Sequence, residues 1–167
     1  MALRVLVALD GSEQSLRAVA HVEKVMLEGC CCDVTLFHVS GIPAEYLEHE
    51  GSSGRDPEGQ APGDLRSRRA AWEEETRAKV ENEIFGPARR LLLKESHDRV
   101  SSRLFSKLDL EPHHRVASSI LWEAERGDYD AVVVGRRGLS NVEGFLLGSV
   151  SSKVIHHLQG RTVWVVE

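Results

Sequence analysis

One stretch, residues 130–160, limits what this chain can fold into more than any other. It opens with a short apolar run that stops at Gly135, and Gly138 follows after two intervening residues. After nine further residues comes the pair Gly148-Ser149, where apolar residues begin to recur at helical spacing. The order of these signals predicts a buried strand, a glycine-rich loop and then a helix.

A loop of this kind can bind a phosphate group. Glycines let backbone N–H groups approach an anion closely, and a helix start offers N–H groups with a partial positive charge. We therefore interpret the stretch as a nucleotide-binding loop, with an ordinary surface loop and a capped helix as the alternative. Neither G-x-x-x-x-G-K-[ST] nor G-x-G-x-x-G occurs in it.

Composition sets the broad class of protein. The length of 167 residues suits a single domain, which we expect to span residues 1–167. The net charge of −5 argues against nucleic acid or an acidic membrane as a general partner. No apolar run is long enough to span a membrane, and the N-terminus does not resemble a secretory signal. The consecutive cysteines at 30–32 form a poor disulfide framework, which favours a reducing, cytoplasmic compartment.

The N-terminal part predicts a βαβ unit. Residues 3–9 are nearly all apolar, as in a strand that is buried on both faces of a parallel sheet. A turn at residues 10–12 leads into an amphipathic helix that ends at Gly29. Residues 33–39 then predict a second strand, parallel to the first.

The middle of the chain carries weaker signals. Residues 40–69 are rich in Gly, Pro, Ser and charge, so we expect a long, partly mobile loop. It could close over a ligand as a lid or be a tolerated surface insertion. Residues 64–83 turn helical in composition, Gly86-Pro87 should interrupt that helix, and residues 88–104 can form a second helical piece.

The C-terminal part completes the alternation of strands and helices. We place the third strand at residues 105–111, after which His113-His114 enter the next helix, and residues 116–126 form a short helical face. The fourth strand follows Asp130, and the fifth is at residues 162–166. Such alternation without an internal repeat predicts an α/β protein with an open, doubly wound parallel sheet of five strands.

Asp10 is a second candidate for a functional role. It stands at the carboxyl end of the first strand, the edge at which open α/β sheets bind their ligands. A carboxylate there could accept hydrogen bonds from a ribose hydroxyl or an adenine amino group. A helix N-cap is the alternative role.

These two segments together resemble the universal stress protein family of the ATP-binding type. The resemblance lies in VALDGSEQS near the N-terminus and in the G-x-x-G, nine residues, Gly-Ser pattern of residues 135–149. It implies a Rossmann-like sheet with strand order 3-2-1-4-5, in which strands one and four flank the nucleotide. Asp10 and Gly135 should then lie on one cleft.

The resemblance also implies ATP, with Mg or Mn, as the ligand. The residues that it places around the nucleotide are Ala8, Asp10, Val39, Val134, Gly135, Arg137, Gly138, Gly148, Ser149, Val150 and Ser151. Either Arg136 or Arg137 could supply the positive charge that lysine gives in other phosphate loops, or both could be solvated.

Three functions compete at this point. The family resemblance implies a nucleotide-binding regulatory protein of stress responses. A slow ATPase or phosphoryl-transfer enzyme is the second, although no nucleophile or general base is marked near the loop and H-x-G-H is absent. A nucleotide-free dimeric interaction protein is the third, and the intact glycines argue against it. The apolar strand at 163–166 predicts a homodimer, because a bare sheet edge invites pairing and this strand pairs across a two-fold axis in the family.

Overall fold

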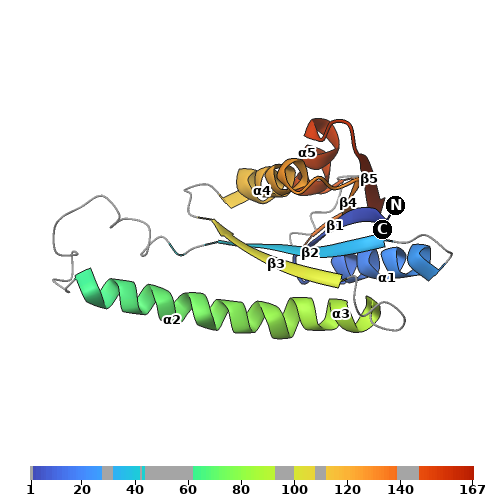
Figure 1. The fold of residues 1–167 in the computed structure, drawn as a ribbon. Coiled ribbons are helices and arrows are strands. Elements are labelled where there is room, and N and C mark those ends of the chain that lie inside the picture. Colours follow the sequence, from blue (N-terminus) through green and yellow to red (C-terminus); the bar gives the residue numbers. More distant parts are fainter. Residues whose placement is uncertain are drawn as a thin grey trace.

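The structure, a computed structural model, describes residues 2–27, 32–41, 43, 62–92, 100–107, 112–138 and 147–167. A parallel sheet forms the central layer and helices cover both of its faces (Figure 1). The strands are β1 (Leu3–Leu9), β2 (Cys32–Gly41), β3 (Val100–Lys107), β4 (Ala131–Gly135) and β5 (Thr162–Val166). The helices are α1 (Glu13–Leu27), α2 (Pro62–Val80), α3 (Gly86–Leu92), α4 (Pro112–Arg126) and α5 (Ser149–His157).

The sheet confirms the predicted fold class. Its strand order is β3-β2-β1-β4-β5, and every neighbouring pair is parallel. The two central strands, β1 and β4, are apolar runs, and Val7 and Val133 lie opposite each other with no exposed surface. Such runs suit a strand that packs on both faces, which explains why they occupy the centre.

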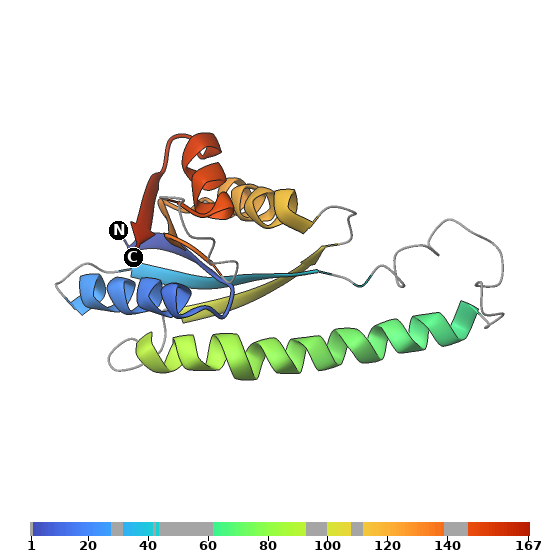
Figure 2. The ribbon, with the colours of Figure 1, turned by 180° about the vertical axis from the view of Figure 1, so that it is seen from behind.

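Alternating side chains of the central strands build two cores, one on each face. Val5 and Val7 pack on the face covered by α1 and α3. Leu6 and Val132 pack on the opposite face, which α4 and α5 cover (Figure 2). The period of two along each strand therefore distributes one apolar run between both cores.

The predicted loop at residues 40–69 is wrong at both ends. Strand β2 continues to Gly41, and α2 already begins at Pro62. Proline is favoured in the first turn of a helix, because its missing N–H has no intrahelical partner there and its fixed φ suits the helix. Residues 42 and 44–61 lie outside the described residues, as does the prediction made for them.

The predicted helix break at Gly86-Pro87 is also wrong. The chain stays helical through it, because a π-helical turn at Glu81–Phe85 links α2 to α3. In that turn the N–H of Gly86 donates to the carbonyl of Glu81, five residues back. Pro87 then falls in the first turn of α3, where a proline does not break a helix.

Strand β3 begins five residues earlier than predicted. It covers Val100–Lys107, so residues 100–104 lie in the segment that was expected to be helical, and it occupies one edge of the sheet. Its sequence VSSRLFSK is half polar, as an edge strand tolerates, so it lacks the apolar run that marked the central strands. Helix α4 correspondingly begins at Pro112, and His113-His114 lie in its first turn, which confirms that they enter this helix.

Cys32 is buried at the start of β2, whereas Cys30 and Cys31 lie outside the described residues. Within the described ranges, none of the helices combines the length and the apolar character that crossing a membrane requires.

Candidate functional site

The carboxyl ends of β1, β2 and β4 border a cavity of about 340 Å³, together with α4 and the N-terminus of α5. All eleven residues that the sequence placed around a ligand line this cavity. They are Ala8, Asp10, Val39, Val134, Gly135, Arg137, Gly138, Gly148, Ser149, Val150 and Ser151. The chain therefore brings together two segments that lie more than 100 residues apart in the sequence.

The cavity wall has an apolar part and a polar part. Phe37, Val134 and Ile120 belong to the core on the α4 and α5 face, with Val39 and Val150 packed against that core. The carboxylate of Asp10, the glycine-rich loop and the N-terminus of α5 form the rest of the wall. A cavity with this division suits a ligand that has one apolar end and one polar or anionic end.

Asp10 lies between the carboxyl end of β1 and the glycine-rich loop. Its Oδ1 accepts a hydrogen bond from the backbone N–H of Ser12 at 2.9 Å. A Cβ atom on Gly138 would collide with its Oδ2, so a larger residue at this position would have to displace the Asp10 carboxylate.

The alternative role of Asp10 as the cap of α1 is wrong. Ser12 caps the helix, because the N–H of Ser15 donates to its Oγ at 3.2 Å. The hydroxyl of Ser15 also donates to the carbonyl of Ser12 at 2.8 Å. The capping of α1 therefore does not account for an aspartate at position 10.

The two ends of the glycine-rich loop are held together at the carbonyl of Arg136. This oxygen accepts hydrogen bonds from the N–H of Gly148 at 2.8 Å and from the hydroxyl of Ser151 at 2.9 Å. The Ser151 hydroxyl also lies 3.0 Å from the carbonyl oxygen of Gly148. The hydroxyl of Ser151 therefore makes its hydrogen bonds within the loop.

The N-terminus of α5 presents backbone donors to the cavity wall. No side chain caps this helix at Gly148, and the first-turn N–H groups of Ser149, Val150 and Ser151 have no acceptor within the helix. The aligned peptide dipoles add a partial positive charge at the same place. This arrangement is chemically suited to an anion.

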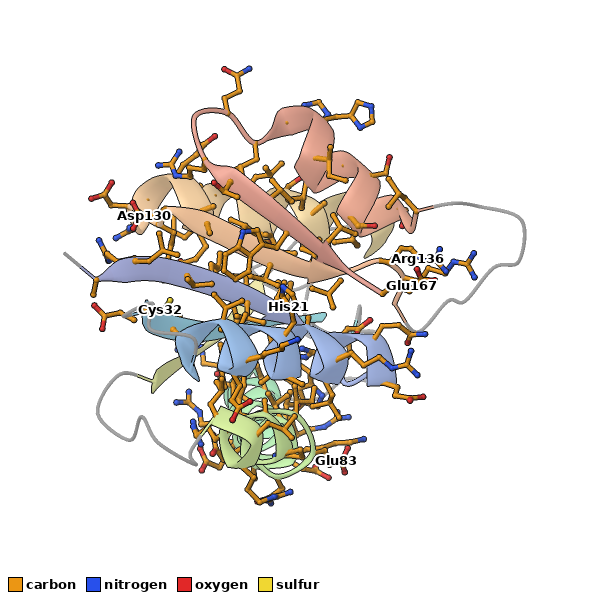
Figure 3. The ribbon with its side chains drawn as sticks, turned by 90° about the vertical axis from the view of Figure 1, so that its right-hand side faces the viewer. His21, Cys32, Glu83, Asp130, Arg136 and Glu167 are labelled. Carbon is orange, nitrogen blue, oxygen red and sulfur yellow. The ribbon has the colours of Figure 1, made fainter. Side chains whose placement is uncertain are left out.

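The two arginines of the loop point to different places. Arg137 lines the cavity. The guanidinium of Arg136 instead pairs with Glu167, with 2.5 Å between Nη2 and Oε1, beyond the end of β5 (Figure 3). Of the two candidates for a charge beside a phosphate, Arg137 is the one in the cavity wall.

Six lining residues were missed by the sequence reasoning. They are Leu9, Ser15, Phe37, His38, Val116 and Ile120. Leu9 and His38 are direct neighbours of predicted residues, and Phe37 lies two positions before the predicted Val39, which was an available signal. Val116 and Ile120 come from α4, whose placement over the sheet no local pattern indicates.

His38 is the titratable residue among these six. Its Nδ1 lies 2.7 Å from the carbonyl oxygen of Leu9, so in the neutral ring this nitrogen carries the proton and donates. Burial lowers the pKa of His38 below its ordinary value, while the Leu9 carbonyl and the charge of Asp10 act in the opposite direction. The ring is therefore held neutral beside the cavity.

A twisted parallel sheet with a ligand-sized cavity at its carboxyl edge defines a Rossmann-like α/β protein. Residues 111–167 match the model of the universal stress protein family. A segment of 36 residues is 58% identical to the universal stress protein Sll1388 of Synechocystis sp.. That segment is 22% of this chain and spans only 23% of the length of that relative.

Solved structures support the same fold over the whole chain. Hypothetical protein MJ0577 superposes with a TM-score of 0.67 at 20% identity, covering 99% of this chain and 96% of its own. The universal stress protein UspA of Lactobacillus plantarum gives 0.62 at 15% identity, with 99% and 97% covered. A universal stress protein in complex with cAMP gives 0.54 at 19% identity, with 99% and 96% covered. The resemblance to the universal stress protein family is confirmed, and the family model matches the C-terminal third of the chain.

Proposed function

We propose that this protein is an ATP-binding regulatory protein of the universal stress protein type. The observation that carries the proposal is the convergence of Asp10, the glycine-rich loop and the N-terminus of α5 on one cavity. An adenine nucleotide has the matching chemistry, with a flat, largely apolar base, a ribose and an anionic tail. The solved relative in complex with cAMP supports this class of ligand.

In the proposed complex the base lies against the apolar part of the wall, between Ala8, Val39 and Val134. Asp10 accepts hydrogen bonds from the ribose or the adenine amino group. The phosphates receive backbone N–H groups from the glycine-rich loop and from the first turn of α5, and Arg137 adds a positive charge. Ser151 contributes its N–H, because its hydroxyl already binds Arg136 and Gly148.

Magnesium or manganese would accompany ATP as a partner of the phosphates. Among the residues described by the structure, no three His, Cys, Asp or Glu side chains gather into a metal site. Magnesium commonly keeps several waters and binds phosphate oxygens with only one or two protein ligands, so a dedicated protein cage is not needed. The ion would screen the phosphate charges in the cavity.

The test is a direct assay for bound nucleotide. Protein as purified is denatured and its nucleotide identified by chromatography, and equilibrium dialysis with ATP, GTP and magnesium follows. We expect an adenine nucleotide and a preference for ATP, whereas no binding at millimolar ATP would favour the nucleotide-free dimer. The same samples, followed for ADP over hours, distinguish a regulatory binder from the alternative of a slow ATPase.

We also propose that two copies of this chain pair through β5. This strand is at the edge of the sheet, and Val163, Trp164 and Val165 are only half-buried. Pairing with a second copy would cover their exposed surface and their edge N–H and C=O groups. Sedimentation should give a dimer at micromolar concentration, and removal of residues 163–167 should give monomer or unfolded protein. A monomeric wild type would contradict this proposal.

A further inference from the structure

Arg136 connects three parts of the molecule that are separate in sequence. Its carbonyl oxygen accepts the hydrogen bonds of Gly148 and Ser151 at the start of α5. Its own N–H donates to the carbonyl of Val166 at 2.6 Å, and its guanidinium pairs with Glu167. The end of β5 therefore holds Arg136, and Arg136 in turn holds the first turn of α5.

The side chain of Arg136 lies in a different place from that of its neighbour, Arg137. Arg137 lines the cavity, whereas the side chain of Arg136 is directed to the end of β5, where Figure 3 shows it beside Glu167. The ion pair with Glu167 therefore accounts for a charged residue at position 136 without any contact to a ligand. The pair with Glu167 fixes the residue from the outer side, at the point where the loop begins.

We propose that Arg136 is a positioning residue for the anion-binding loop. By pairing with Glu167, it keeps its carbonyl where Gly148 and Ser151 bind, and so keeps the backbone donors of α5 directed at the ligand. The part that concerns ligand affinity rests on the proposed nucleotide function. The part that concerns the order of the loop does not, and it can be tested without nucleotide.

The expected effect is moderate. The side chains of Arg136 and Glu167 are 31% and 72% exposed, and pairs of this exposure contribute little to overall stability. The backbone hydrogen bonds of Arg136 also survive a change of its side chain. We expect local opening of the loop to increase by roughly two- to fivefold when the pair is removed, and the effect to shrink in high salt.

The first experiment measures amide hydrogen exchange at Gly148 by NMR in the protein without nucleotide. Glu167→Gln and Arg136→Ala should each speed exchange there by roughly two- to fivefold, because both remove the ion pair that restrains the carbonyl to which this amide donates. Arg17→Ala is the matched control, since it removes an exposed ion pair with Glu13 on α1, at 2.7 Å. Unchanged exchange at Gly148 in both variants, or an equal change in the control, would overturn the proposal.

The second experiment measures ATP affinity by calorimetry in the same variants. Each single variant should bind roughly two- to fivefold more weakly, and Arg136→Lys or the swap Arg136→Glu with Glu167→Arg should recover part of the loss. A purely structural defect would not be recovered by the swap. If wild type binds no ATP, the proposed function fails while hydrogen exchange still decides the positioning role. If wild type binds and all variants bind equally, the positioning role in binding is wrong.

Discussion

Helices α5 and α2, on opposite sides of the sheet, differ in how they are attached. On the cleft side, the start of α5 is held by hydrogen bonds to the preceding loop. On the other side, α2 extends well beyond the edge of the sheet (Figures 1 and 2). Its described side chains are exposed or half-exposed until Val80, and burial continues at Phe85, Ala88 and Leu92.

This difference indicates where on each side of the sheet substitutions should be tolerated. The cleft depends on close approaches of the loop backbone, as of Gly138 to the Asp10 carboxylate, so small side-chain additions there should be costly. The long helix depends on a few apolar residues near its C-terminal end, so most of α2 should tolerate substitution. Substitutions in the core, in the cleft and on the exposed part of α2 test this contrast.

Phe85→Ala should have the largest effect on stability. Phe85 is 3% exposed and packs in the core on the α1 and α3 face. Its truncation should lower the free energy of unfolding by about 3–5 kcal/mol. Glu74→Ala on the exposed part of α2 is the matched comparison and should stay within about 0.5 kcal/mol of wild type. Urea denaturation measures both, and similar losses would remove the contrast along this helix.

Asp10→Asn should weaken ATP binding without disturbing the turn into α1. The amide keeps an oxygen that can accept the hydrogen bond of the Ser12 N–H, but the negative charge is lost. Hydrogen bonds to charged groups contribute about 1.5–3 kcal/mol, which corresponds to a loss of roughly ten- to 150-fold in affinity. Selectivity for ATP over other triphosphates should fall as well. Calorimetry with ATP and GTP measures both, and unchanged selectivity would show that Asp10 does not contact the base.

Ser12→Ala should cost less, because it removes a cap and no large side chain. The backbone N–H of Ser15 would lose its acceptor at the start of α1. We expect a loss of about 1 kcal/mol in the free energy of unfolding. Denaturation of Ser12→Ala beside Ser12→Asp, which retains a capping oxygen, checks the mechanism. A loss of the same size in both variants would contradict a capping role.

His38 should make stability depend weakly on pH. The pKa of His38 lies below its ordinary value of 6.5 in the folded protein, chiefly because of burial. As pH falls below about 6.5, the unfolded chain therefore takes up a proton that the folded protein does not, and stability declines. Above that pH both states are neutral at this residue and the contribution is fully present. Thermal unfolding of wild type and His38→Gln between pH 8 and pH 5 should show the steeper decline in wild type, and parallel curves would contradict it.

The sequence predicted those parts of the fold that carry a strong local signal. Strands β1, β4 and β5 are marked by apolar runs and turn residues, so their positions agreed with the prediction to within one residue. Strand β3 is half polar and lies at a sheet edge, where pairing with β2 rather than its own sequence decides its place. The π-helical turn before Pro87 depends on a backbone rearrangement that no periodicity reveals.

The candidate site likewise contains residues with a local sequence signal and residues without one. Its glycines and Asp10 carry a local signal, because turns and close approaches require particular residue types. The lining residues Val116 and Ile120 carry none, since they reach the cavity only through the packing of α4 over the sheet. The different directions of Arg136 and Arg137 likewise depend on the position of β5, which adjacent residues in a sequence cannot show.

We propose that the cavity between Asp10 and the glycine-rich loop binds ATP. Calorimetry of wild type, Gly138→Val and Gly41→Val with ATP and magnesium tests it most directly, with folding checked by circular dichroism. A Cβ at Gly138 would collide with Asp10, whereas one at Gly41 would meet nothing within 4 Å. Losing two or more charged hydrogen bonds at about 1.5–3 kcal/mol each should weaken binding at least roughly a hundredfold in Gly138→Val. The control should bind as wild type does, and a folded Gly138→Val that binds ATP as tightly as wild type would contradict the claim.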